Sequence, residues 1–236
     1  MLYNDLARKG HMKKDILSVC NVVKTFKQAD ETLEVLNGIT YEFQRGRTYA
    51  ITGASGSGKS TLVHIMSGMD DPTEGSVSYN GYLLGHFSVR KKEELLNKHI
   101  GLVFQQPYLI RELTVIENVM LKKMISAPAT KSDHEKAHEL LSYIGLDAKS
   151  NSTPRSLSGG QQQQVAIVRA IFNKPAFLLA DEPTGNVDRK TGKRIVSLLR
   201  SCQKEWGMGV VVSTHDMYVA RAMECQLHLE GGKLHC

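Results

Sequence analysis

The chain has 236 residues, of which 41% are hydrophobic and 23% are charged, and its formal charge is +6 at pH 7. This balance indicates a globular protein with a sizeable core, and no apolar run of about 18 residues occurs that would span a bilayer. The positive charge fits a solvated surface, a nucleic acid, an anionic membrane or a phosphate ligand, so charge alone selects no partner.

The N-terminal third reads as extended structure. Residues 1–14 lack the apolar core of a secretory signal, so we expect an N-terminal extension on a protein that stays in the cytosol. Short segments rich in β-branched and aromatic residues then predict strands at 16–20, 39–43 and 48–52. The segment 75–84 alternates around Asn80-Gly81, which predicts a β-hairpin.

The stretch "GASGSGKST" matches the phosphate-loop pattern G-x-x-x-x-G-K-[ST], between an expected strand and an expected helix. Its glycines let several backbone N–H groups face one anion, and the following helix adds its positive end. We expect Lys59 to reach the β- and γ-phosphates of a nucleoside triphosphate, Ser60 to ligate Mg²⁺ and Thr61 to contact the α-phosphate. A chance match in a Gly/Ser loop is the alternative, and the flanking elements argue against it. The residues expected to line the nucleotide are Gly53, Ala54, Ser55, Gly56, Ser57, Gly58, Lys59, Ser60 and Thr61.

From about residue 91 the pattern becomes helical, and we expect a helical insertion over about 91–165. Ser132 and Glu135 have capping-box spacing and predict one helix start. Ser158 and Gln161, in "LSGGQQQQVAIVRAIF", have the same spacing and predict another. The glutamine run 162–164 is expected on the polar side of that helix, rather than in a linker.

After residue 165 short apolar strands alternate with helices, which favours a buried parallel sheet. The expected strands are 177–180 and 210–214, and Gly231-Gly232 predicts a final hairpin. We therefore expect one α/β domain over 15–236. Its core is formed by about 15–90 and 166–236, from both ends of the chain.

Acidic residues follow the first of these strands, at the sheet edge where ligands bind in open α/β folds. Asp181 fits the Mg²⁺-side carboxylate, and Glu182 fits a general base that activates the attacking water. On its own an Asp-Glu pair is usually a solvated turn, but beside a phosphate loop it predicts catalysis. His215 follows the strand 210–214; a lone histidine there is usually structural, yet this one would reach a γ-phosphate.

The ordered set "GASGSGKST", "VFQQP", "LSGGQ", "LLADEPTGNVD" and "VVSTHD" resembles the ATP-binding cassette (ABC) family of transporter ATPases, from about residue 16 to the C-terminus. The resemblance implies a P-loop NTPase core with a mainly parallel sheet, an antiparallel β subdomain at the N-terminal side and an α-helical insertion subdomain. It implies ATP and Mg²⁺ as cofactors. It also supports the role of His215.

The resemblance assigns further residues. Gln105 resembles the glutamine that contacts Mg²⁺ and the attacking water, Asp188 resembles an aspartate that communicates across a dimer, and Phe26 resembles the aromatic residue that stacks on adenine. A core aromatic near a strand end is the alternative for Phe26. In this family two cassettes associate head to tail, so each ATP lies between one phosphate loop and the partner's signature. The signature residues here are Ser158, Gly159, Gly160 and Gln161.

The partners implied are a second copy of the chain and integral-membrane transporter subunits, with no nucleic acid. The protein would then lie at the cytoplasmic face of the inner membrane, and the segment 109–120 would receive the membrane subunit. The segments "ADEPTGNVD", "SGMDDPTEG" and "LTVIENV" are similar to the lipoprotein-releasing, macrolide-exporting and cell-division group, and most to the lipoprotein-releasing type. A soluble cassette acting on DNA or ribosomes, and a regulatory ATP-binding module without turnover, are the rivals. Gln164 departs from the arginine common in the family.

Overall fold

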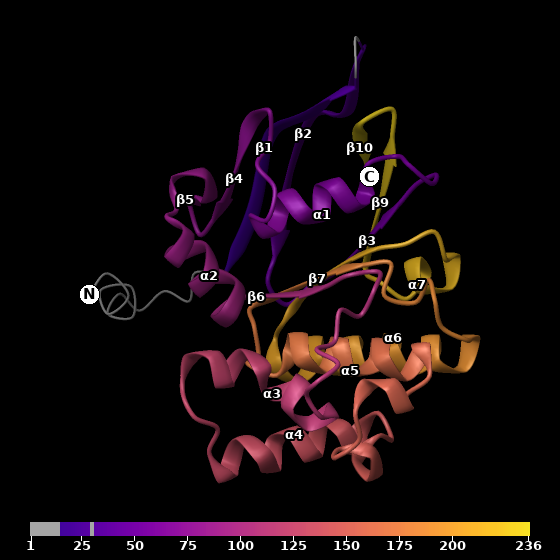
Figure 1. Ribbon diagram of the computed structural model, residues 1–236. Helices are drawn as coiled ribbons and strands as arrows, with labels where there is room; N and C mark the ends of the chain where they lie inside the picture. The colour runs from indigo at the N-terminus through magenta and orange to yellow at the C-terminus, as the bar shows by residue number, and fades with distance from the viewer. Residues whose placement is uncertain (1–14, 29–30) are drawn as a thin grey trace.

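The computed structural model describes residues 15–28 and 31–236, and the extension expected over 1–14 lies outside these residues. The chain forms two β-sheets with helices between and below them (Figure 1). The mixed α/β fold, with one antiparallel and one mainly parallel sheet, confirms the predicted fold class.

The N-terminal sheet has four strands in the order β2-β1-β4-β5, and all its pairs are antiparallel. Its strands are β1 (Ile16–Gln28), β2 (Glu31–Gln44), β4 (Glu74–Tyr79) and β5 (Tyr82–Leu83). Asn80 and Gly81 join β4 to β5 with φ values of 53° and 81°. Positive φ at both central positions is what a tight two-residue turn requires, so the predicted hairpin is confirmed.

The central sheet has six strands in the order β10-β9-β3-β8-β7-β6, and all of its pairs are parallel except β9 with β10. Its strands are β3 (Thr48–Thr52), β6 (Ile100–Val103), β7 (Phe177–Asp181), β8 (Gly209–Ser213), β9 (Cys225–Glu230) and β10 (Lys233–His235). Every residue of β7 and β8 is buried, as expected of strands covered on both faces. The C-terminal hairpin is confirmed.

Strand β6 is a departure from the sequence prediction. The span 91–165 is not helical throughout, because residues Ile100–Val103 pair in parallel with β7 at the edge of the central sheet. These four residues carry little alternation and stand between two helical segments. Strand β6 therefore separates a helix that ends at Lys98 from the helices that follow it, and the loop after β6 lies at the carboxyl edge of the sheet.

The helices divide between the two faces of the central sheet. They are α1 (Lys59–Ser67), α2 (Val89–Lys98), α3 (Val115–Ser126), α4 (Lys131–Tyr143), α5 (Gly159–Ile171), α6 (Arg189–Trp206) and α7 (Met217–Arg221), with 3₁₀ turns at Leu84–His86, Asp147–Lys149 and Pro154–Ser156. Helix α1 packs between the two sheets, α5, α6 and α7 cover the opposite face of the central sheet, and α3 and α4 pack below α5 (Figure 1). Alternate residues of β7 supply both layers: Leu179 faces α1, and Leu178 faces the helices below.

The start of α4 corrects a second prediction. The N-cap is Thr130, whose side chain accepts a hydrogen bond from the Asp133 backbone N–H, and the Asp133 carboxylate accepts one from the Thr130 backbone N–H. The capping box therefore lies two residues before the Ser132–Glu135 pair. Aspartate at the fourth position closes the box as glutamate does in other helices.

Among the helices in the part of the chain that the structure describes, none is both long and apolar enough to cross a membrane.

Candidate nucleotide site

The phosphate loop connects β3 to α1, as predicted, and its glycines occupy positions that other residues do not fit. A Cβ on Gly53 would lie 2.4 Å from the Leu229 carbonyl oxygen, and one on Gly58, whose φ is +99°, would lie 2.8 Å from Val35 Cγ1. The loop is thus pressed between β9 and β2, with its backbone free to curl.

Lys59 is the first residue of α1, and only 6% of its surface is exposed. Its ammonium donates to the carbonyl oxygens of Gly53 and Ala54, at 3.0 and 2.8 Å. The lysine therefore folds back over its own loop and holds its charge beside the N-terminus of α1. Such a concentration of positive charge and N–H groups suits a phosphate.

The hydroxyl of Ser60, one residue further on, donates to Asp181 Oδ1 at 2.9 Å. Asp181 ends β7, and the same oxygen accepts a 2.5 Å bond from Ser213 Oγ at the end of β8. The structure thus joins Ser60 and Asp181, the two residues expected to hold Mg²⁺. It also adds Ser213, which the sequence analysis missed; its position at the end of a strand next to β7 was the available signal.

These oxygens suit magnesium. Among the described residues there is no group of three or more His, Cys, Asp or Glu side chains that would hold a metal alone. Mg²⁺ is typically bound by one or two protein oxygens together with phosphate oxygens and water. A hydroxyl and a carboxylate that converge beside a phosphate loop fit that donor set.

Glu182 follows β7 with a φ of 44°, a left-handed conformation that is uncommon for a non-glycine residue. Its backbone N–H donates to the carbonyl and hydroxyl oxygens of Ser213, both at 3.1 Å, and this holds the turn. Glu182 Oε1 lies 2.9 Å from His215 Nδ1, whereas Oε2 is buried with no hydrogen-bond partner among the described residues. A carboxylate oriented by a histidine and with one free oxygen is suited to take a proton from water.

Gln105 lies on the loop after β6, at the same sheet edge, since Val103 pairs with Ala180 of β7. The side chain of Gln105 is exposed, and its backbone carbonyl oxygen accepts a hydrogen bond from Asn186 Nδ2 at 3.4 Å. No hydrogen bond among the described residues joins the Gln105 side chain to Ser60, Asp181 or Glu182.

Ser158 and Gln161 form the predicted capping box at the start of α5: each side chain bonds the other's backbone N–H, at 3.3 and 3.1 Å. Helices α5 and α1 pack on opposite faces of the central sheet. The signature residues therefore form no common pocket with the phosphate loop of the same chain. A Cβ on Gly160 would be 3.6 Å from Val187, so the signature instead lies beside the segment that ends in Asp188.

Two glutamines of this helix depart from expectation. Gln163 and Gln164 are 2% and 4% exposed, so the polar face predicted for residues 162–164 is wrong for these two. Both glutamines lie on the side of α5 that packs against the rest of the protein, so their side chains are buried.

Asp188 is the N-cap of α6 and accepts from the backbone N–H groups of Lys190 and Thr191. The hydrogen bond from the Thr191 hydroxyl is the main cause that lowers the pKa of the Asp188 carboxyl. Phe26 lies on β1 opposite Leu33, is 43% exposed and has Lys24 Nζ 5.2 Å from its ring centre. An exposed ring is free to stack on a planar ligand, which disfavours the core-aromatic alternative.

Known proteins match this arrangement. Residues 36–185, more than half of the chain, match the family model described as "ABC transporter". A dimeric structure of a post-hydrolysis state of the ATP-binding cassette MJ0796, bound to ADP and Pi, is 38% identical, with a TM-score of 0.87 over 93% of this chain and 97% of that chain. A dimeric structure of MJ0796, a bacterial ABC transporter cassette, matches over the same shares at 38% identity with a TM-score of 0.88. The chain belongs to the ABC transporter family.

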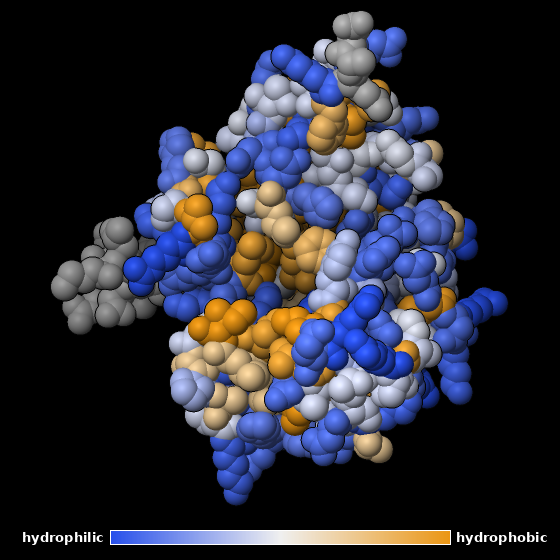
Figure 2. Space-filling model, viewed as in Figure 1, coloured by the Kyte–Doolittle hydropathy of each residue, from blue (hydrophilic) through white to orange (hydrophobic). Residues whose placement is uncertain are grey.

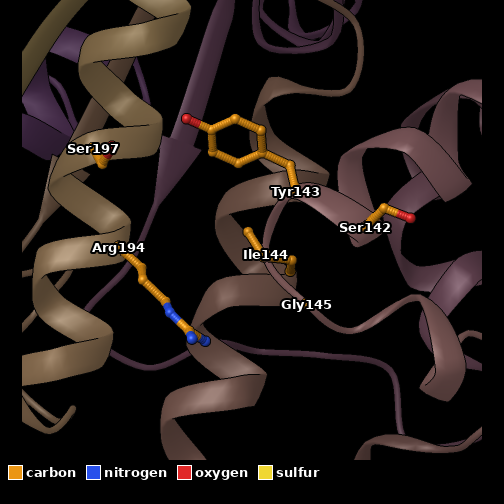
Figure 3. A pocket seen from close by; sticks show the side chains of 6 residues that line it. All are labelled: Ser142, Tyr143, Ile144, Gly145, Arg194 and Ser197. Atoms are coloured by element: carbon orange, nitrogen blue, oxygen red, sulfur yellow. The ribbon is translucent and has the colours of Figure 1, made fainter.

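As an ABC cassette the chain is an ATPase, and its cofactors are ATP and Mg²⁺. The ABC site lies at the carboxyl edge of the central sheet. A cavity of about 330 Å³ lies elsewhere, between the end of α4 and α6, where the Arg194 side chain points toward Gly145 (Figure 3). None of the predicted site residues lines that cavity. It is lined by Ser142, Tyr143, Ile144, Gly145, Arg194 and Ser197.

Proposed function

We propose that the chain is the ATP-hydrolysing subunit of a membrane ABC transporter and powers export or extraction through a separate transmembrane subunit. The observation that carries the proposal is the convergence of Lys59, Ser60, Asp181 and Glu182 at one edge of the central sheet. This edge brings together a positively charged loop that suits phosphates, a pair of oxygens that suits a cation, and a carboxylate that is oriented by a histidine.

In the proposed reaction, the loop from Gly53 to Thr61 holds the triphosphate by backbone N–H groups, and Lys59 neutralises the β- and γ-phosphates. Ser60, Asp181 and Gln105 would hold Mg²⁺, which when bound offsets negative charge on the phosphates. Glu182 accepts a proton from the attacking water through its free oxygen.

His215 orients Glu182 through their 2.9 Å contact. In this proposal His215 would also donate a hydrogen bond to the γ-phosphate. Phe26 supplies a face for the adenine ring by stacking. The phosphate loop, Glu182 and His215 thus act on the bound triphosphate, while Phe26 fixes the base.

We further propose that the active form is a head-to-tail homodimer. Because α5 and the phosphate loop lie on opposite faces of one sheet, Ser158–Gln161 are available to a second copy. The start of α5 is a helix N-terminus, which suits the exposed γ-phosphate of ATP held by the partner. Asp188, next to the signature, lies at the same interface. ATP then favours the closed dimer, and hydrolysis releases it.

The proposed membrane contact lies on the face shown in Figure 2, where apolar side chains gather in a hollow above α3. The segment before α3 carries the exposed apolar residues Tyr108 and Ile110, and Ile125 near the end of α3 is 76% exposed. Asn118 bonds both backbone groups of Ile110, so the segment before α3 is held on the helix. An exposed apolar area that is held rigid supports a protein partner for residues 109–120, and hence a peripheral position at the cytoplasmic face of the inner membrane.

Within the family, the sequence likeness to the lipoprotein-releasing group supports a lipoprotein or another amphipathic substrate. A macrolide or peptide exporter, or a cell-division cassette, is the alternative. The substrate would be selected by the membrane subunit, so identifying the membrane protein that copurifies with the chain tests both readings. Ile110→Asp should abolish that copurification, and Tyr143→Ser, which changes an exposed aromatic on α4, should not. Recovery with DNA or ribosomes in place of a membrane protein would contradict the transporter reading.

Replacement of Glu182 by glutamine tests the catalytic part. Glu182→Gln should lower ATP turnover at least about a hundredfold, because it removes the base but keeps the shape. ATP binding should persist, and size-exclusion chromatography with ATP should show a stable dimer. Glu230→Gln, at the exposed end of β9, is the matched control and should behave as wild type. Undiminished turnover in Glu182→Gln would contradict the role of Glu182, and near-normal ATP affinity and turnover in Lys59→Ala would contradict the phosphate loop.

A further inference from the structure

The loop 104–108, which carries Gln105, is fastened to α5 at both of its ends. At its start, Gln163 Nε2 donates to the Phe104 carbonyl at 3.0 Å. At its end, the Arg169 guanidinium donates to the carbonyl oxygen of Pro107 at 2.7 Å and to that of Tyr108 at 2.8 Å. Both donors belong to one helix and lie six positions apart, so the loop spans less than two turns of α5.

The end held by Arg169 is also strained. Tyr108 has a φ of 41°, a left-handed conformation that costs free energy for a residue with a Cβ. Hydrogen bonds from a charged donor are short and strong, and here two of them hold consecutive carbonyl groups. The rings of Phe104 and Tyr108 meet edge to face, with centroids 5.4 Å apart, so the loop closes on itself between its anchors.

Gln105 and Gln106 are the exposed residues between these anchors. The same helix begins with the signature residues Ser158–Gln161. We infer that Arg169, together with Gln163, is a positioning residue that makes loop 104–108 and the start of α5 one rigid unit. The position of Gln105 relative to the nucleotide of its own chain is then set by these two side chains. This inference rests on the role proposed for Gln105.

The test compares Arg169→Met, Gln105→Ala and the double variant in the full chain. The readouts are kcat for ATP hydrolysis, the Mg²⁺ concentration at half-maximal rate, and ATP affinity measured in EDTA. Arg169→Met and Gln105→Ala should each lower kcat and raise the Mg²⁺ requirement roughly tenfold, because a misplaced ligand loses alignment. Affinity for ATP without Mg²⁺ should not change. The double variant should be no worse than the worse single variant, since both changes remove one effect.

Arg45→Met is the matched control, because Arg45 likewise donates to two consecutive carbonyls, those of Trp206 and Gly207, away from the loop. It measures the stability lost with such bonds and should leave the Mg²⁺ requirement unchanged. Arg169→Lys keeps the charge but has one donor nitrogen in place of the two that bond the carbonyls, so it should recover part of kcat. This variant keeps the test valid if Arg169→Met unfolds. Losses that multiply in the double variant, or a wild-type Mg²⁺ requirement in Arg169→Met, would overturn the inference. Full activity in Gln105→Ala would instead refute the role proposed for Gln105.

Discussion

At the scale of single residues, Ser213 connects the two acidic groups of the site. Its hydroxyl donates to Asp181 Oδ1, and both its oxygens accept from the Glu182 backbone N–H. The serine therefore orients a proposed metal ligand and fixes the turn that presents the proposed base. Groups that orient a metal ligand commonly change metal affinity by ten- to a hundredfold when removed.

Ser213→Ala should accordingly raise the Mg²⁺ concentration needed for half-maximal ATPase activity by about tenfold. Titration of activity with MgCl₂ at saturating ATP measures this. Ser67→Ala is the control, since Ser67 is equally buried but its hydroxyl donates to the His64 carbonyl and not to Asp181. An unchanged Mg²⁺ requirement in Ser213→Ala would show that Asp181 is oriented without it.

Lys122 is a second informative residue. Its side chain is half-buried, and its ammonium donates to the carbonyl oxygens of Leu96 in α2 and Ile100 in β6, at 2.7 and 3.4 Å. Burial lowers the pKa of Lys122 from 10.5 to about 8, with a smaller contribution from Arg169. Because the fold disfavours the charged form of Lys122, this side chain holds its proton more fully in the unfolded chain than in the folded one between about pH 8 and pH 10.5. Stability then rises with pH across that window.

Relative to Lys122→Met, the free energy of unfolding of the wild type should therefore increase between about pH 8 and pH 10, by up to roughly 3 kcal/mol. Urea denaturation of both proteins at several pH values measures the difference, and groups common to both cancel. A difference that stays flat or falls with pH would contradict the lowered pKa.

The site could be predicted where its residues belong to contiguous patterns. Lys59 and Asp181 each stand at a fixed place beside a strand end, so local sequence was sufficient, whereas His215 was assigned mainly through the family resemblance. Ser213 was missed because a serine at the end of an apolar strand has no pattern of its own. Gln163 and Gln164 were misplaced because the side that a polar residue faces depends on what the helix packs against.

At the scale of elements, β6 shows why a short strand escapes prediction. Its four residues include Gly101, and its pairing with β7 is long-range, so neither propensity nor alternation marks it. The glycine is needed for packing: a Cβ there would lie 2.6 Å from the Ala170 carbonyl of α5 and 2.9 Å from Leu178 Cδ1. The start of α5, which is marked by its capping box, and β7, which is marked by a continuous apolar run, were predicted to within one residue.

Gly101→Ala should therefore destabilise the protein by roughly 1–3 kcal/mol, because β6 and α5 have no room to separate. Thermal or urea unfolding measures the loss. Gly85→Ala is the control, since a Cβ at Gly85 meets nothing within 4 Å. Equal stability of the two variants would mean that the sheet and α5 adjust freely.

At the scale of the whole molecule, the proposed dimer makes each active site a product of two chains. Lys59→Ala damages the site built on the phosphate loop of the chain that carries it. Ser158→Arg leaves its own chain's phosphate loop intact but damages the signature that this chain contributes to its partner's site. A mixed dimer of these variants contains one intact site. Mixing equal amounts should restore about a quarter of wild-type activity if single sites turn over independently, because half of the dimers are mixed and each has one working site of two.

The control mixture joins Lys59→Ala with Glu182→Gln. Both changes affect the site built on their own chain's phosphate loop, so every site in a mixed dimer carries a defect and no activity should return. Recovery in the control mixture, or none in the first, would contradict the head-to-tail arrangement. ATPase assays on freshly mixed and equilibrated samples distinguish these outcomes.

The order of strands in the central sheet has a consequence for synthesis. Strand β3, which leads into the phosphate loop, lies between β8 and β9, and these begin only at Gly209 and Cys225. A growing chain thus exposes its phosphate loop long before either neighbour of β3 exists, since contacts between distant residues form late. Nascent chains that end before residue 209 should not retain ATP. The capacity to bind nucleotide is therefore acquired near the end of translation, when the last strands emerge.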